Sequence, residues 1–140
     1  MLAKGSPLEK FVLEWCLENF YPLQVYKERP WLVLTYEEVI SRPKQVSELI
    51  CSRFDLPDPK RMARIVGRPS RTTFFADARE AIVKQGPQVM LGRWLKRVSQ
   101  EELRGIQEIL DVLGLRAYQA FSPYPAEALC HFGPLAQEKL

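Results

Sequence analysis

The sequence lacks the features that define membrane, disulfide-rich and metal-binding proteins. Its longest unbroken apolar run, Trp31 to Leu34, is far shorter than the roughly 20 residues that cross a bilayer, and residues 1–6 do not form a signal peptide. The three cysteines are far apart, without Cys-x-x-Cys spacing, and only one histidine, His131, accompanies them. We therefore expect a cytoplasmic protein with no membrane partner, no metal site and no disulfide framework.

Several catalytic signatures are also missing. The sequence has no glycine-rich phosphate loop with its lysine, no Gly-x-Ser-x-Gly and no His-Glu-x-x-His. Its 140 residues are 46% hydrophobic and 26% charged, which is ordinary for a single globular domain with a core. The chain can therefore fold, but no motif assigns it an activity on its own.

Charge is distributed unevenly along the chain. Residues 41–97 contain thirteen lysines and arginines against five acidic residues, whereas the rest of the chain contains seven against twelve. Such a local excess of positive charge can attract an anionic ligand, and it is equally consistent with a surface that only faces solvent. No recognised nucleic-acid-binding motif accompanies the charge, so we do not expect DNA or RNA as a partner.

Helices are predicted from their start signals. Ser6 with Glu9, and Ser99 with Glu102, have the spacing of capping boxes, and each precedes apolar residues at helical intervals. Pro43 can occupy the first turn of a further helix, and residues 60–66 read as a short basic helix. We therefore expect a chain that is locally mostly α-helical.

One strand is predicted, near residues 31–36. This run is apolar and rich in β-forming residues without polar alternation, which is typical of a strand covered on both faces in an α/β protein. Such a strand needs hydrogen-bonding neighbours on both sides, but residues 71–76 and 88–91 are only weak candidates. The sheet is then completed by another chain, or the rest of it is missing from this one.

Three motifs follow one another in an order that resembles a known family. Tyr-Glu-Glu at residues 36–38 ends the expected strand and leads to the proline-started helix. Arg-Pro-Ser-Arg-Thr-Thr follows at residues 68–73, and Gly-Arg-Trp at residues 92–94 precedes the capped helix. In this order they resemble the C-terminal part of bacterial-type sulfotransferases, which use 3′-phosphoadenosine 5′-phosphosulfate (PAPS). The resemblance implies an α/β, P-loop-like sulfotransferase fold, with a partial domain over residues 1–125 and an irregular tail over residues 126–140.

The resemblance also implies contacts to the nucleotide. Tyr36 takes the place of a tyrosine that lies against adenine, and Ser70 and Thr72 belong to a hydroxyl-bearing loop that contacts the same base. Lys84 stands where the family holds the 3′-phosphate, and Arg93 substitutes as a second phosphate ligand. The implied co-substrate is PAPS, and no metal is implied.

The sequence departs from the family pattern in places, and each residue also has a structural interpretation. The second basic residue after Lys84 is replaced by Gln85, and Gly86 is followed by Gly92 at six positions rather than three. From the residues alone, the commoner role of a tyrosine such as Tyr36 is to close a core. Hydroxyls such as those of Ser70 and Thr72 more commonly shape turns, and the alternative for Arg93 is a side chain that faces solvent.

The family's N-terminal elements are absent from the sequence. It contains no Pro-Lys-Ser-Gly-Thr-like loop for the 5′-phosphosulfate and no upstream catalytic base. The resemblance therefore implies a truncated or split sulfotransferase, inactive alone, without catalytic residues of its own and with an N-terminal half as its partner. The competing hypothesis is a non-enzymatic helical interaction module that self-associates through an exposed strand or an apolar helix face.

Overall fold

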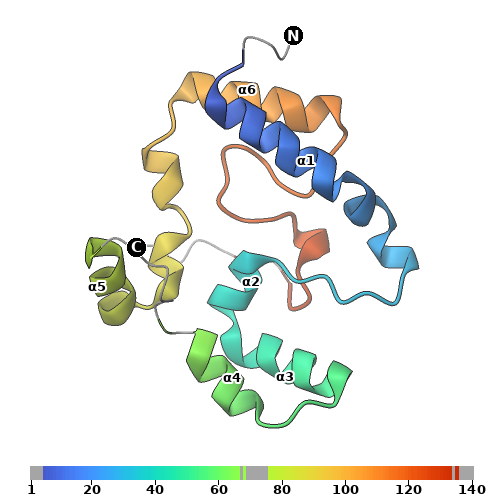
Figure 1. The fold of residues 1–140 in the computed structure, drawn as a ribbon, viewed down its shortest axis with the longest axis vertical. Helices are drawn as coiled ribbons and strands as arrows, with labels where there is room; N and C mark the ends of the chain where they lie inside the picture. Colours follow the sequence, from blue (N-terminus) through green and yellow to red (C-terminus); the bar gives the residue numbers. More distant parts are fainter. Residues whose placement is uncertain (1–4, 67, 69–75, 134, 136–140) are drawn as a thin grey trace.

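The protein is seen in a computed structural model that describes residues 5–66, 68, 76–133 and 135. These residues form six α-helices joined by 3-10 turns and irregular segments, and they contain no β-strand (Figure 1). The expectation of a locally helical chain is confirmed, and the strand expected near residues 31–36 is wrong. None of the described helices is both long and apolar enough to cross a membrane.

Helices α1 (Pro7–Val25) and α6 (Gln100–Val112) lie side by side and contain the main core (Figure 1). Both begin at the predicted capping boxes, in which the serine hydroxyl and the glutamate carboxylate each accept a backbone N–H of the other residue. Each serine cap stabilises its helix by about 1 kcal/mol. The buried core between the helices consists of Cys16, Leu103, Ile106, Leu110, Leu115 and Ala120.

Three helices follow one another at the other end of the molecule (Figure 1): α2 (Tyr36–Ser41), α3 (Pro43–Phe54) and α4 (Pro59–Val66). Helices α3 and α4 pack against each other, and Val46 and Cys51 of α3 are buried. Asp58 begins α4, since its carboxylate accepts the N–H of Arg61 at 2.9 Å. The helices expected after Pro43 and over residues 60–66 are therefore confirmed.

Helix α5 (Ala76–Gln85) and two 3-10 turns, η3 (Pro87–Met90) and η4 (Arg93–Lys96), connect these two ends. Gly86 separates α5 from η3 with a φ of +87°, a conformation that other residues rarely adopt. Residues 88–91, a weak strand candidate, lie in or directly after the turn η3, and residues 71–75 lie outside the described residues.

The segment 31–35, predicted as a buried strand, instead runs as an irregular connection into α2 (Figure 1). Residues 31–34 form no backbone–backbone hydrogen bond within the described part of the chain, and Trp31 is 49% exposed. Thr35 caps α2 by accepting the N–H of Glu38 at 3.2 Å, so Tyr36 begins a helix rather than ending a strand. Among the described residues no strand lies beside this run, although a sheet requires such neighbours.

The chain after α6 returns to α2 and is fixed there by hydrogen bonds. The Tyr118 hydroxyl donates to Glu37 at 2.9 Å, and the N–H of Phe132 donates to the Glu38 carboxylate at 3.1 Å. Further contacts join Arg42 to the Gly133 carbonyl, Tyr26 to the Ala128 carbonyl and His131 to the Val33 carbonyl. Residues 126–133, irregular apart from the 3-10 turn η5 (Glu127–Leu129), are thus held against the rest of the fold.

Tyr118 should make the stability of this arrangement depend on pH. Burial, followed by the charge of Glu37, raises the pKa of its phenol above the ordinary value. A raised folded-state pKa means that the stabilisation is complete below the unfolded value of about 10 and is lost as the pH rises beyond it. We predict that the unfolding free energy, measured by urea denaturation, falls above about pH 10.

Below that pH, Tyr118→Phe should lower the unfolding free energy by roughly 1.5–3 kcal/mol, because it removes a hydrogen bond to a carboxylate. Above that pH, the unfolding free energy of the variant should fall less steeply than that of the wild type. Tyr36→Phe, at a phenol that is 62% exposed, serves as the control and should keep the wild-type slope. Parallel pH curves for the wild type and Tyr118→Phe would contradict the assignment.

Candidate functional site

Of the five residues predicted to contact a nucleotide, the structure describes three, and these three do not line one common hollow. Ser70 and Thr72 lie outside the described residues. Tyr36 is the exposed first residue of α2, and Lys84 forms an ion pair with Glu80 one turn earlier on α5. Arg93 alone among the described three lines a surface hollow, whereas Tyr36 and Lys84 do not.

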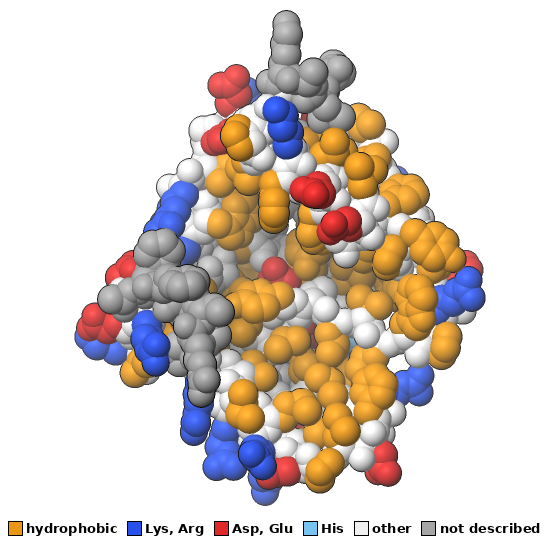
Figure 2. All heavy atoms as spheres, in the orientation of Figure 1, with side chains coloured by type: hydrophobic (Ala, Val, Ile, Leu, Met, Phe, Trp, Pro, Cys, Tyr) orange, Lys and Arg blue, Asp and Glu red, His pale blue; other side chains and the backbone are white. Residues whose placement is uncertain are grey.

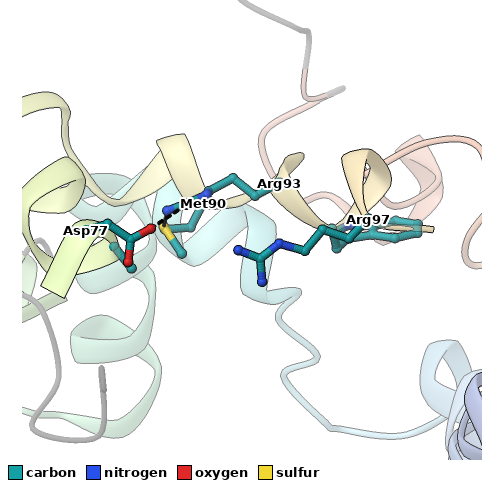
Figure 3. A pocket seen from close by; sticks show the side chains of 6 residues that line it. Asp77, Met90, Arg93 and Arg97 are labelled. Atoms are coloured by element: carbon teal, nitrogen blue, oxygen red, sulfur yellow. Dashed lines mark hydrogen bonds and ion pairs between the residues drawn. The ribbon is translucent and has the colours of Figure 1, made fainter. Parts of the chain in front are cut away.

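The hollow has a volume of about 270 Å³ and is formed where α5, η3 and η4 meet (Figure 3). Its lining comprises Asp77, Ala78, Met90, Arg93, Trp94 and Arg97. Arg93 donates to the Asp77 carboxylate at 3.0 Å and contacts the Met90 sulfur at 3.4 Å. In Figure 3 the Arg97 side chain extends towards the side on which Asp77 and Met90 lie.

Local sequence positions these side chains. Gly86 allows the chain to turn sharply after α5, and Pro87 then starts η3 with the backbone angle that a helical turn needs. Leu91 is buried between the two turns and anchors them. Arg93 and Arg97 are four residues apart, so the turn η4 and the residue after it bring both to the same hollow.

The hollow carries a net positive charge. Two guanidinium groups face one carboxylate, and the hydrogen bond from Arg93 lowers the pKa of Asp77 below its ordinary value. Arg97 forms no ion pair with any described residue. An arginine presents a planar set of donors that fits phosphate or sulfate oxygens in pairs, so one such donor set remains available here.

The size and lining of the hollow suit part of an anionic aromatic ligand. Its volume is slightly below the roughly 300–1,000 Å³ of typical ligand pockets, so it accommodates a phosphate and adjoining groups rather than a whole nucleotide. Trp94 is 39% exposed and offers an indole face beside the two cations. The hollow thus combines two guanidinium groups, one carboxylate and one indole face.

Sequence reasoning missed most of this hollow. Trp94, the last residue of the Gly-Arg-Trp motif, was not predicted as a contact, yet it lines the hollow. Arg97 could have been found from its helical spacing to Arg93. The part played by Asp77 depends on how α5 packs against η4, for which the sequence carries no local signal.

A second group of polar residues is buried around α2, and it too was missed. Glu38 is fully buried, and the Arg42 guanidinium lies 3.9 Å from one oxygen of its carboxylate. The other carboxylate oxygen of Glu38, Oε2, has no hydrogen-bond partner among the described residues. Burial, and then the nearby Glu38 charge, raise the pKa of the Cys130 thiol. Because Glu38 is sealed from solvent and joins α2 to the chain's later part, we assign it a structural role.

The described residues contain no cluster of histidine, cysteine and acidic side chains that could hold a metal ion. Comparisons of the chain with protein-family models, with curated proteins and with solved structures found no match. The chemistry of the site must therefore be argued from its own residues.

Proposed function

We propose that this chain forms the nucleotide-binding side of a PAPS-dependent sulfotransferase and is inactive without a second part. The observation that carries the proposal is the positively charged hollow, in which Arg93 and Trp94 lie together with Arg97, which forms no ion pair with the described residues. Gly-Arg-Trp at residues 92–94 is also one of the motifs through which the sequence resembles that family. Motif and geometry thus support the same anionic, aromatic ligand.

Different residues of the hollow would bind the phosphate and the base of the nucleotide. The guanidinium groups of Arg93 and Arg97 would pair with phosphate oxygens, and the indole of Trp94 would lie against the ribose or adenine. Tyr36, Ser70, Thr72 and Lys84 remain proposed contacts on the strength of the resemblance alone. Lys84 would have to exchange its partner Glu80 for phosphate, which costs little because both side chains are about two-thirds exposed.

The reaction itself needs groups that this sequence does not contain. Transfer of a sulfuryl group to a hydroxyl or amine requires a nucleophile in line, a base to take its proton, and cations on the leaving phosphate. A second part would supply the phosphosulfate loop and the base. The segment 31–34 supports such a partner, because its apolar side chains are only half-buried or exposed and it forms no backbone–backbone hydrogen bond with the described residues.

Nucleotide binding can be tested by calorimetric titration with 3′-phosphoadenosine 5′-phosphate, the product nucleotide. We expect saturable binding that weakens about tenfold or more in Arg97→Ala, equivalent to about 1.4 kcal/mol, because a charge-assisted contact is removed. Lys96→Ala is the matched control, since Lys96 lies in the same turn, is exposed and does not line the hollow. Absence of binding by a folded sample, or equal weakening in both variants, would refute the proposal.

Asp77 should oppose nucleotide binding. Its carboxylate occupies the Arg93 guanidinium and repels an incoming phosphate, so Asp77→Asn should raise the affinity several-fold in the same titration. The gain should shrink at high salt, which screens exposed charges. A lower affinity in Asp77→Asn would mean that the hollow does not hold the phosphate.

A second candidate function is that of a non-enzymatic interaction module. Helix α1 presents a second apolar face, with Phe20 39%, Tyr21 58% and Leu17 60% exposed. Figure 2 shows hydrophobic side chains gathered over α1 and the segment that follows it. Leu13 continues this face one turn earlier, and the spacing is that of a helix that packs on a partner.

If the chain is such a module, it should self-associate through this face even in about 1 M salt, where charge interactions are screened. Leu17→Glu should then abolish the association in sedimentation velocity, whereas Glu18→Gln, on a neighbouring exposed position, should not. A monomer at all concentrations in high salt would exclude self-association by this route.

A further inference from the structure

Helix α4 presents a basic surface, with the carboxylate of Asp58 capping its first turn. Lys60, Arg61 and Arg64 are exposed, whereas Met62 and Val66 on the opposite face are half-buried. The helix contains no acidic residue, and none of the three basic side chains forms an ion pair with a described residue. Residues three and four apart are neighbours on a helix, so the three charges form one continuous patch, which we term the α4 basic face.

The α4 basic face also includes an apolar edge. Ile65, which follows Arg64, is 58% exposed. The complement of an aliphatic side chain beside three cations is a surface with an apolar floor and an acidic rim.

A groove of this kind lies between α1 and α6. It has a volume of about 290 Å³, with Leu13, Ile109 and Val112 among its apolar lining and the carboxylates of Glu9 and Glu108 beside them. Val112 is 80% exposed, although it is a large aliphatic residue. We term this feature the α1–α6 groove.

Glycine at position 105 shapes the groove. A side chain there would collide with the Glu9 carboxylate, so Gly105 is what allows Glu9 to lie against α6. Glu101 is seven residues before Glu108 and therefore lies on the same side of α6. Helices α1 and α6 together contain seven acidic residues and only two basic ones, which gives the groove a negative surrounding.

The two surfaces lie at opposite ends of the molecule. In Figure 1, whose vertical direction is the longest axis, α1 and α6 are at the top and α4 is at the bottom. Figure 2 shows several basic side chains gathered near the lower end, with a few acidic ones among them, and mainly acidic side chains near the upper end. The basic excess of α4 therefore lies far from the acidic excess of α1 and α6.

We propose that this protein associates head to tail with a second copy of itself, the α4 basic face of one copy docking in the α1–α6 groove of the next. Lys60, Arg61 and Arg64 then lie against the carboxylates at the groove, and Ile65 covers part of its apolar floor. The occupant is a second copy because the chain itself carries both halves of the complementary pair. Such a contact uses two different surfaces, so it builds rings or open chains rather than a twofold dimer.

The association should depend on salt. Sedimentation velocity at increasing protein concentration should show growing species at about 0.1 M salt and a monomer at about 1 M salt, where the Debye length falls from about 10 Å to about 3 Å. Association that survives at 1 M salt would belong to the apolar face of α1 and would overturn the proposal. A monomer at low salt up to the highest concentration would overturn it as well.

Charge reversal supplies the decisive test. Arg61→Glu with Arg64→Glu makes both ends acidic, and Glu101→Lys with Glu108→Lys makes both ends basic. Each double variant alone should associate more than about tenfold more weakly than the wild type. An equimolar mixture of the two should recover association, because each α4 then meets a groove of opposite charge. Failure of the mixture to associate, with both variants folded by circular dichroism, would refute the docking.

Two controls separate this contact from general charge effects. Lys44→Glu with Lys96→Glu changes the net charge by the same amount at exposed positions outside the α4 basic face, and it should leave association unchanged. Neutral variants, Arg61→Gln with Arg64→Gln, should show an intermediate loss and avoid any new acidic surface. Tight binding of a DNA duplex by a protein that stays monomeric would show that the α4 basic face serves nucleic acid instead.

Discussion

The arrangement of the two ends of this molecule depends on the buried carboxylate of Glu38. Placing a charge away from water costs several kcal/mol unless hydrogen bonds and a counter-charge offset it. The N–H of Phe132 and the guanidinium of Arg42 supply part of that compensation, and Arg42 also donates to the Gly133 carbonyl. The chain after α6 must therefore lie across α2. The same return path brings Tyr118 against both Glu37 and Trp15, which links α2 to α1.

The elements that could be predicted from the sequence are those whose causes are local. Both capping boxes and the proline at position 43 act within one turn of the residues they organise, and all three helices begin where they were expected. The strand failed for the opposite reason. An apolar, β-rich run forms a buried strand only beside neighbouring strands, and the described part of the chain contains none. Thr35 meanwhile offers a local cap, and the following residues form a helix instead.

The candidate site shows the same division. Arg93 was predicted from a short motif, and its place in the hollow follows from the turn in which that motif lies. Tyr36 and Lys84 were predicted from their order along the chain, which does not determine distance in space, and they lie outside the hollow. The contact between Arg93 and Asp77 joins residues sixteen positions apart, and the Glu38 network spans more than ninety. No pattern of neighbouring residues encodes either.

The proposed site is open, and this has a thermodynamic consequence. A ligand held by two guanidinium groups and one indole, opposed by Asp77, leaves most of its surface in water, so its affinity for this chain alone should be modest. If a second part closes over the same nucleotide, each contact that this part adds strengthens both the binding of the nucleotide and the association of the two parts. Binding free energies are coupled reciprocally. The factor by which the partner raises the affinity for the nucleotide therefore equals the factor by which the nucleotide raises the affinity for the partner. An incomplete site of this kind would thus make assembly depend on the presence of the co-substrate.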